Sequence, residues 1–252
     1  MRTLYDALRR TTSVIENCFA AVAQKNELGF HRNCCMCLQS SRNIVCGYCF
    51  HFICRFENSN CSTATNLLEE AEFVKHLETP HYDYLYATGP YQWPLDMLVQ
   101  DLKFHRKAYC AKALASLFHH SVLQHSPFED EHRPEVLVPI PLSNKRHRER
   151  GYNQAQLLCN ALSKLSKIPN AALLKRTKHT QAQSELDRAQ RQDNIKQAFV
   201  YVSDKPYKHI ALVDDVITTG ATINEACLAL LKVLPELRIT VWCMGLTIMK
   251  PS

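Results

Sequence analysis

The sequence contains no long hydrophobic run. None of its apolar stretches approaches the ~20 residues that a membrane-spanning helix needs. Arg2, Arg9 and Arg10 precede an apolar stretch at residues 18–23, but this stretch is too short and too interrupted to form the core of a signal peptide. These absences predict a cytoplasmic protein with no transmembrane segment.

Internal repeats and low-complexity segments are also missing from the sequence. Its 252 residues allow one large domain or a domain with a small added module, and a 46% share of hydrophobic residues is enough for a full core. The net charge of +6 permits an anionic partner without requiring one. The basic residues gather in two clusters, with Lys145, Arg146, Arg148 and Arg150 in the first and Lys175, Arg176 and Lys178 in the second.

Twelve cysteines occur without an export signal, and this combination argues against a disulfide framework and favours metal binding. Two C-x-x-C pairs are present, Cys34 with Cys37 and Cys46 with Cys49. Four thiolates complete a tetrahedral site with no open position, so we predict structural Zn²⁺ at these cysteines. Two alternatives stay open at this point: a metal-free core of reduced cysteines, or replacement of one ligand by Cys35, His51, Cys54 or Cys61.

The cysteine-rich segment also combines arginines with aromatic rings. A surface of this kind suits single-stranded DNA, because arginine pairs with phosphate and the rings stack on bases. The same rings are equally suited to form the small core of the module. The residues concerned are Arg32, Arg42 and Arg55 with Phe30, Tyr48, Phe50 and Phe52.

An apolar stretch at residues 209–213 ends in two adjacent acids, Asp214 and Asp215, and a helical pattern begins shortly after them. Such a stretch is typical of a buried parallel strand, and ligands of open α/β sheets bind at the carboxyl ends of these strands. The acids can accept hydrogen bonds from ribose hydroxyls, while loop amides, hydroxyls and the helix N-terminus favour a phosphate. The segment predicts a site for a phosphorylated sugar, with a loop formed by Thr218, Thr219, Gly220, Ala221 and Thr222.

Two other interpretations fit parts of this segment. Its Asp and Thr residues are also suited to capping the helix that follows, although capping requires one such residue rather than five. A receiver-type phosphorylated aspartate would require a second acidic cluster near the first strand, and the sequence shows none.

Strand and helix patterns alternate through most of the chain, which predicts an α/β domain with a parallel sheet and crossover helices. A polar stretch at residues 175–194 fits no buried element and is predicted to form a lid. We expect strands at residues 82–87, 136–140, 199–202, 209–213 and 239–248, and helices at 94–105, 108–124, 153–166 and 222–233.

Three segments together resemble the ComF family, the ComFC/GntX-like competence proteins related to type I phosphoribosyltransferases. The first is residues 138–143 with the Arg-Gly-Tyr-Asn-Gln run at 150–154. The second is residues 175–181 with Leu186, Arg191, Asn194 and Phe199, and the third is the acid–threonine segment at 214–222. With the cysteine pairs, the resemblance covers roughly residues 31–250.

The resemblance implies a type I phosphoribosyltransferase fold behind a small zinc-ribbon-like module. Apolar residues near helical spacing predict an N-terminal helix at residues 1–30, and we expect the zinc-binding module at 31–61 and the phosphoribosyltransferase-like domain at 62–252. By resemblance, Asp214 and Asp215 hold the ribose hydroxyls of phosphoribosyl pyrophosphate (PRPP) and residues 218–222 hold its 5-phosphate, with Mg²⁺ accompanying the ligand. The loop after Pro141 would face pyrophosphate, and the candidate catalytic residues are Asp214, Asp215 and Arg150.

The resemblance also implies a role in DNA uptake during natural transformation, or in the use of DNA as a nutrient. Two classes of function remain open. One is a PRPP-binding protein that handles single-stranded DNA, together with a helicase-like partner. The other is an enzyme that transfers phosphoribose to an unknown nucleobase or amine, with Tyr91, Trp93 and residues 102–105 as candidates for contacting a base.

Overall fold

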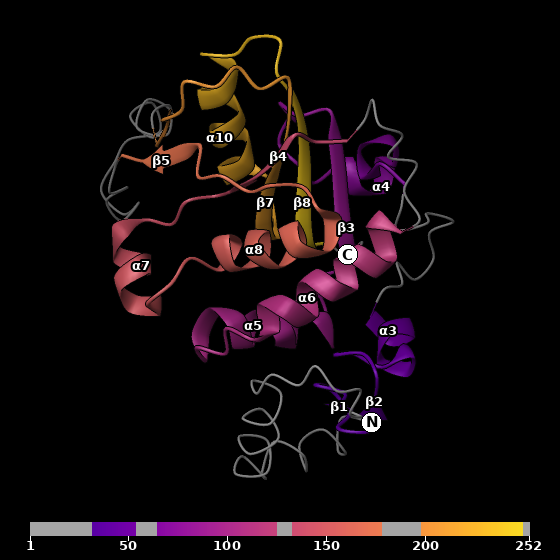
Figure 1. Cartoon of the computed structure of the whole chain (residues 1–252). Helices are drawn as coiled ribbons and strands as arrows, with labels where there is room; N and C mark the ends of the chain where they lie inside the picture. Colours follow the sequence, from indigo (N-terminus) through magenta and orange to yellow (C-terminus); the bar gives the residue numbers. More distant parts are fainter. Residues whose placement is uncertain (1–31, 54–64, 125–132, 178–197, 249–252) are drawn as a thin grey trace, which may run out of the picture. The chain divides into compact units, whose positions relative to one another are not determined.

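The computed structural model describes residues 32–53, 65–124, 133–177 and 198–248 (Figure 1). The chain divides into two compact units, Met1–His51 and Phe52–Ser252. The helix predicted at residues 1–30 and most of the predicted lid, residues 178–194, lie outside the described residues. No helix within the described ranges is long and apolar enough to cross a membrane.

The second unit is built on a four-stranded parallel sheet. Its strand order is β3 (Tyr84–Pro90), β8 (Arg238–Leu246), β7 (His209–Ile217) and β4 (Val136–Pro139), and every neighbouring pair is parallel. Helices separate these strands along the chain, as parallel pairing requires. The predicted α/β class, with a central parallel sheet and crossover helices, is confirmed.

The two faces of the sheet pack against different helices, because successive strand residues point to opposite faces. Ile210, Leu212 and Val241 belong to a core cluster with residues of α10 (Ala221–Leu231). On the opposite face, the Trp242 ring lies 5.3 Å from the ring of Phe118. Three helices accompany that face: α5 (Leu95–Phe104), α6 (Cys110–Phe118), which continues through the π-helical turn η2 (His119–Leu123), and α8 (Gln154–Ser166).

The connection between β4 and β7 contains one helix that the sequence did not predict. The basic cluster at residues 145–150 forms the helix α7 (Asn144–Arg150). Ser143 caps its start by accepting a hydrogen bond from the Arg146 amide, and Gly151 ends it with φ of 81°. The strand expected at residues 199–202 exists as β6 (Phe199–Tyr201), but it pairs antiparallel with β5 (Leu174–Arg176) and not with the main sheet.

Short elements complete the described residues. η1 (Leu67–Glu69) and α4 (Ala71–Val74) lie beside β3. Asn66 ties this segment to β3, because its side-chain oxygen accepts hydrogen bonds from the amides of Leu68 and Leu85. The first unit contains the antiparallel pair β1 (Arg32–Asn33) and β2 (Ser40–Ser41), and α3 (Gly47–Ile53) begins within it.

Candidate functional site

The paired acids lie inside β7 and not beyond its end. The strand continues to Ile217, four residues further than the sequence predicts, and Asp214 is paired with Cys243 of β8. This pairing holds the backbone of the acids at the carboxyl end of the sheet, where α/β proteins bind ligands. Asp214 Oδ1 accepts a hydrogen bond of 2.8 Å from the Asp215 amide.

Lys103 forms an ion pair with the second acid. Its Nζ lies 2.7 Å from Asp215 Oδ1, and only 17% and 4% of the two side chains are exposed. The other oxygen, Asp215 Oδ2, is buried and has no hydrogen-bond partner among the described residues. Lys103 therefore occupies one oxygen of Asp215, and the second oxygen is left without a partner inside the described part of the site.

The neighbouring charges of the site also change the pKa of Asp214. Burial and the neighbouring Asp215 carboxylate raise the pKa of Asp214 to about 7, while the Asp215 amide and the cations Lys103 and Arg150 oppose this shift. Asp214 thus changes charge near neutral pH, and Lys103 and Arg150 both stabilise its ionised form.

This pKa leads to a pH prediction for ligand binding. Because the pKa is raised, Asp214 is protonated below about pH 7 and becomes a carboxylate above it. Only the carboxylate offers both oxygens as acceptors. We expect the affinity for PRPP to rise about tenfold or more between pH 6 and pH 8 in isothermal titration calorimetry.

The matched control for that titration is Asp214→Asn, which cannot ionise. Phosphate groups of the ligand also titrate near pH 6, and they do so equally with both proteins. The pH dependence of the variant therefore measures the contribution of the ligand alone. Identical profiles for the parent and the variant would show that Asp214 does not titrate at the site.

The loop after β7 ends in a glycine that the backbone requires. Gly220 has φ of 82° and immediately precedes α10, a conformation that other residues adopt only with strain. Thr218, Thr219 and Thr222 are exposed, so their hydroxyls are accessible at the start of the helix. The Thr219 hydroxyl also accepts a 3.4 Å hydrogen bond from the Ala221 amide.

The segment before β3 braces this loop from the other side. The Glu78 amide donates to the Thr219 carbonyl at 2.9 Å. Asn224 of α10 donates to the Thr79 carbonyl and accepts from the His81 amide, both at 3.1 Å. Sequence reasoning did not identify Asn224, since its partners lie far away in the chain and leave no local signal.

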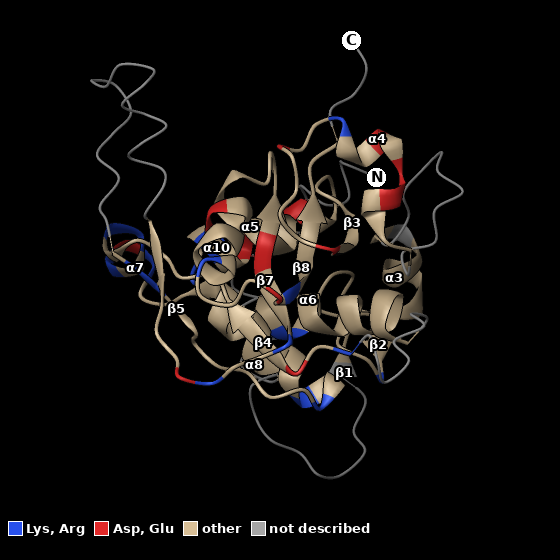
Figure 2. Cartoon of the chain, turned by 90° about the horizontal axis from the view of Figure 1, so that it is seen from above, with Lys and Arg blue, Asp and Glu red and all other residues tan. Residues whose placement is uncertain are grey.

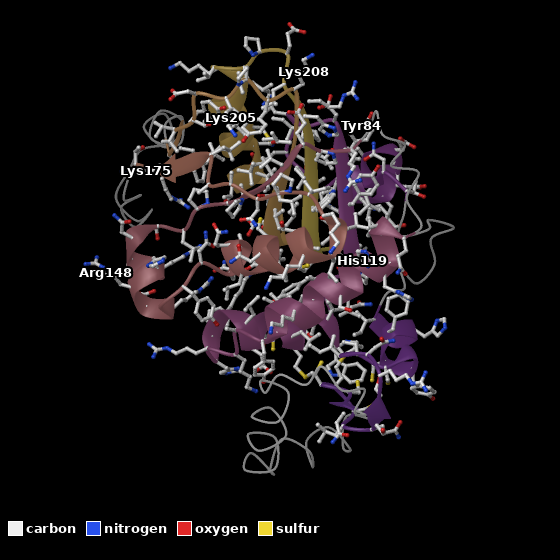
Figure 3. The ribbon with its side chains drawn as sticks, in the orientation of Figure 1. Tyr84, His119, Arg148, Lys175, Lys205 and Lys208 are labelled. Atoms are coloured by element: carbon white, nitrogen blue, oxygen red, sulfur yellow. The ribbon has the colours of Figure 1, made fainter. Side chains whose placement is uncertain are left out.

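Basic residues are concentrated on α7. In Figure 2 the ribbon of α7 is largely blue, for Lys and Arg, and red segments on β7 mark its acids. Lys145, Arg146 and Arg148 are exposed, whereas Arg150 is half-buried with its guanidinium 5.4 Å from the centre of the Phe104 ring. Figure 3 shows Arg148 on α7 and Lys175 on β5 at the same edge of this unit.

Arg176 of the second basic cluster lies on β5, over the ring of Phe199 at 5.2 Å. Burial lowers the pKa of this guanidinium, and the nearby Glu225 opposes that shift. Its Nε has no hydrogen-bond partner among the residues that the structure describes. Lys178, the last member of the cluster, lies outside those residues.

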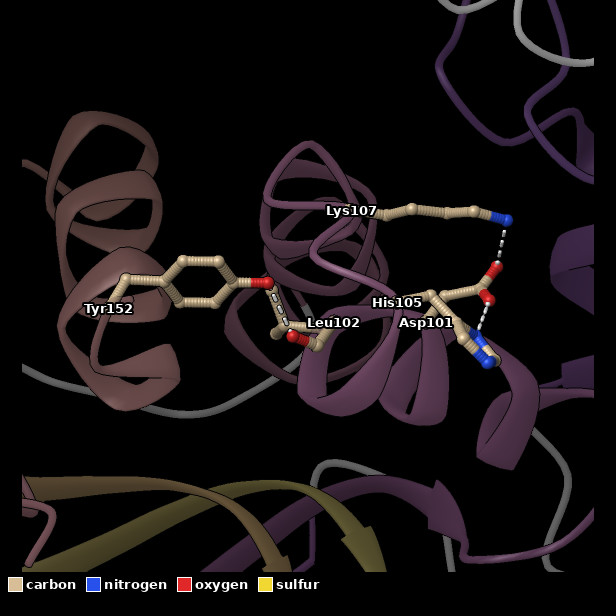
Figure 4. A network of polar contacts seen from close by, with 5 residues as sticks. All are labelled: Asp101, Leu102, His105, Lys107 and Tyr152. Atoms are coloured by element: carbon tan, nitrogen blue, oxygen red, sulfur yellow. Dashed lines mark hydrogen bonds and ion pairs between the residues drawn. The ribbon is translucent and has the colours of Figure 1, made fainter. Parts of the chain in front are cut away.

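The end of α5 is tied to the chain after α7 (Figure 4). The Tyr152 hydroxyl donates a 2.6 Å hydrogen bond to the carbonyl of Leu102. Asp101, one residue earlier, binds His105 Nδ1 at 2.8 Å and Lys107 Nζ at 3.1 Å. These contacts hold the helix end on which Lys103 and Phe104 lie, so the position of Lys103 against Asp215 is supported from two sides.

The four predicted metal ligands come together in the first unit. The Sγ atoms of Cys34, Cys37, Cys46 and Cys49 all lie within 4.8 Å of one another. Amides of Met36 and Cys46 point at Cys34 Sγ at 3.5 and 3.3 Å. Hydrogen bonds from Cys49 and from these amides lower the pKa of Cys34 to about 4, which favours the thiolate form that binds metals.

The cluster can hold a metal ion such as zinc, because four converging thiolates match its tetrahedral preference. Cys35 and His51, two of the alternative ligands, are not part of the cluster. Burial raises the pKa of Cys35 to about 12, so this thiol stays protonated. Cys54 and Cys61 lie outside the described residues.

Comparisons with known proteins identify the family to which the chain belongs. No family model matches the chain. Over 169 residues, it is 40% identical to "Competence protein F" of Haemophilus influenzae, across 66% of this chain and 73% of that protein. The chain belongs to the ComF family. A second relative, "DNA utilization protein YhgH" of Escherichia coli O157:H7, is 33% identical over 67% of this chain and 74% of its own.

Two further matches to this ComF-family chain are more limited. "Competence protein ComFC" of Bacillus subtilis is 36% identical over 99 residues, or 38% of each chain. Among solved structures, a glutamine PRPP amidotransferase from B. subtilis complexed with ADP and GMP aligns with 54% of this chain and 25% of that chain. The identity there is 16% and the TM-score 0.30, which is too low to support an argument.

Part of the first segment that resembles the ComF family lies close to the acid pair. Residues 150–154 join the end of α7 to the start of α8, and Asn153 caps α8 while donating to the Ile140 carbonyl at 3.0 Å. Arg150, which belongs to this run, lowers the pKa of Asp214 and so favours its carboxylate form. Lys103 is not part of the segments that resemble the family; the sequence indicates it only within residues 102–105, as a candidate for contacting a base, and its ion pair with Asp215 was not predicted.

Proposed function

We propose that this ComF-family chain binds PRPP or a related ribose phosphate, and that it acts in DNA uptake or in the use of DNA as a nutrient. The observation that carries the proposal is the acid pair of β7, followed by the exposed threonine loop at the start of α10. Asp214 and Asp215 would accept hydrogen bonds from the ribose hydroxyls. Residues 218–222 would hold the 5-phosphate with hydroxyls, amides and the helix N-terminus.

The cations of the site suit the pyrophosphate of PRPP. Arg150 is half-buried next to the acids, and its Nη1 has no hydrogen-bond partner in the described part of the chain. A guanidinium in this state is well suited to bind phosphate oxygens, because it presents several donors in one plane. Carboxylates are ligands that Mg²⁺ prefers, so Asp214 and Asp215 also fit an ion that arrives with the ligand.

The DNA part of the proposal rests on the family and on surface charge. Relatives carry the names "Competence protein F" and "DNA utilization protein YhgH". α7 presents Lys145, Arg146 and Arg148 to solvent with one opposing acid, Glu149. Such a helix suits the phosphates of a single strand. A helicase-like protein in the cytoplasm would be a natural partner, since it supplies single strands.

We predict salt-sensitive binding of single-stranded DNA with little sequence preference. Four to six phosphate contacts give a slope of log K against log salt of about −3 to −4 on a single strand. Fluorescence anisotropy with labelled oligo-dT at increasing NaCl measures this slope. We expect the triple variant K145Q/R146Q/R148Q to reduce the slope by about 2, at ~0.7 for each phosphate contact.

The control for the triple variant is Lys205→Gln with Lys208→Gln, two exposed lysines between β6 and β7. This pair should leave the slope unchanged. Failure of the parent protein to bind oligo-dT at tens of micromolar and low salt would contradict DNA handling. Equal losses in both variants would show that net charge matters and that α7 has no particular role.

A second function, phosphoribosyl transfer to a nucleobase or amine, is favoured by one observation. Lys103 and Arg150 lie beside the acid pair, where cations stabilise a departing pyrophosphate. A pyrophosphate-release assay with PRPP, Mg²⁺ and a panel of nucleobases and amines separates the two functions. Release with one acceptor establishes the enzyme, whereas PRPP binding without release establishes the binding protein.

A further inference from the structure

One aromatic ring, which follows Lys103 in sequence, is highly exposed. Phe104, the last residue of α5, is 66% exposed, the highest value among the large apolar side chains in the described part of the second unit. Its neighbour in sequence, Lys103, is the residue bound to Asp215. The ring therefore lies at the surface, next to the residue that enters the ribose-phosphate site.

One face of the ring has a cationic partner. The Arg150 guanidinium lies 5.4 Å from the ring centre, a distance at which a cation is attracted to an aromatic face. A single exposed apolar residue needs no explanation by itself. An exposed ring that already binds one flat cation, however, has the geometry of a stacking platform, since bases stack on rings and guanidinium groups alike.

The surroundings of the ring are basic. Arg106 is exposed, and its Nη2 lies 3.5 Å from the Glu149 carbonyl of α7, so the end of α5 and the basic helix are in contact. Asp101, the acid nearest in sequence, is occupied by His105 and Lys107. Glu149 is the opposing charge on α7. Arg150 therefore lies over the ring, and the exposed Arg106 follows it by two residues, so cations near the ring complement the phosphates of a nucleic acid strand.

We propose that Phe104 is a stacking platform for one unpaired base of single-stranded DNA, with the adjoining phosphates held by Arg106 and the exposed cations of α7. The proposal rests on the proposed function, because that function supplies the strand as ligand. It adds the position of the strand on the second unit. The arginines and rings of the first unit, from which the sequence predicts DNA binding, then have a minor part.

The platform and the ribose-phosphate site share two elements. Arg150 lies over the Phe104 ring and also favours the carboxylate form of Asp214. Lys103 and Phe104 are consecutive residues at the end of one helix. A strand stacked on Phe104 therefore places a nucleotide beside the acid pair, and PRPP and DNA are expected to influence each other's affinity.

The test is anisotropy with labelled oligo-dT and with an abasic strand of the same length. Loss of one stacked base weakens binding by about 5- to 150-fold, so we expect Phe104→Leu to lose this much for oligo-dT and less than twofold for the abasic strand. Phe104→Trp, which keeps a ring, should bind oligo-dT like the parent. The matched control is Tyr48→Leu in the first unit, where the ring is 78% exposed, and it should retain full affinity.

The outcomes separate the proposal from the function on which it rests. A parent protein that binds no oligo-dT contradicts the proposed function. A parent that binds, with Phe104→Leu unchanged or with Tyr48→Leu carrying the loss, overturns the platform only. Equal losses of Phe104→Leu for both strands also overturn it, because stacking requires a base. Because Phe104 is exposed, the Phe104→Leu variant should unfold at the same temperature as the parent. Calorimetric titration of this variant with PRPP verifies that its ribose-phosphate site is intact.

Discussion

Protein purified without chelator is expected to contain one equivalent of zinc, and Cys46→Ser is expected to lose it together with the fold of residues 32–53. The four Sγ atoms already lie within 4.8 Å of one another, so the cysteine side chains need to move little to bind the ion. In small zinc units, the metal contributes ~10 kcal/mol or more to folding. A unit with so few elements cannot replace that contribution with apolar burial.

The measurement is elemental analysis of the parent and the variant, followed by limited proteolysis with and without chelator. Cys35→Ser is the matched control, because Cys35 lies in the same segment but outside the cluster. It should keep its zinc. Less than half an equivalent of zinc in the parent, or equal losses from both variants, would show that the cluster is a metal-free core.

The double variant Asp214→Asn/Asp215→Asn is expected to bind PRPP about 30- to 150-fold more weakly than the parent. A hydrogen bond to a charged acceptor contributes ~1.5–3 kcal/mol and one to a neutral acceptor ~0.5–1.5 kcal/mol, so about 1–1.5 kcal/mol is lost at each acid. Asparagine keeps the volume of the side chain, so packing changes little. Lys103 loses its ionic partner in this variant, which adds a cost to stability because its side chain is largely buried.

Isothermal titration calorimetry with PRPP and Mg²⁺ measures this loss, and a thermal melt shows that the variant is folded. Asp204→Asn, an exposed acid between β6 and β7, is the control and should leave the affinity unchanged. If the double variant binds PRPP as tightly as the parent, the acids of β7 do not form the site.

Much of the α/β unit follows from local patterns. The apolar stretch before Asp214 predicts the strand, and its pairing adds only the residues up to Ile217. The helices at the predicted 94–105, 108–124 and 153–166 appear as α5, α6 with η2, and α8, with ends that differ by a few residues. The sequence at residues 144–150 did not predict a helix. Because α7 has no buried face, it lacks the apolar periodicity that indicates one.

The sequence by itself determined the chemistry that depends on neighbours in the chain. C-x-x-C spacing brings thiolates together within one short segment, and a strand that runs into an acid pair, a glycine and a helix start is local as well. The tertiary structure alone decided the contacts of Lys103 with Asp215, of Arg150 with Phe104 and of β6 with β5. These partners are distant in sequence and meet only because the sheet and its helices pack, so no local pattern records them.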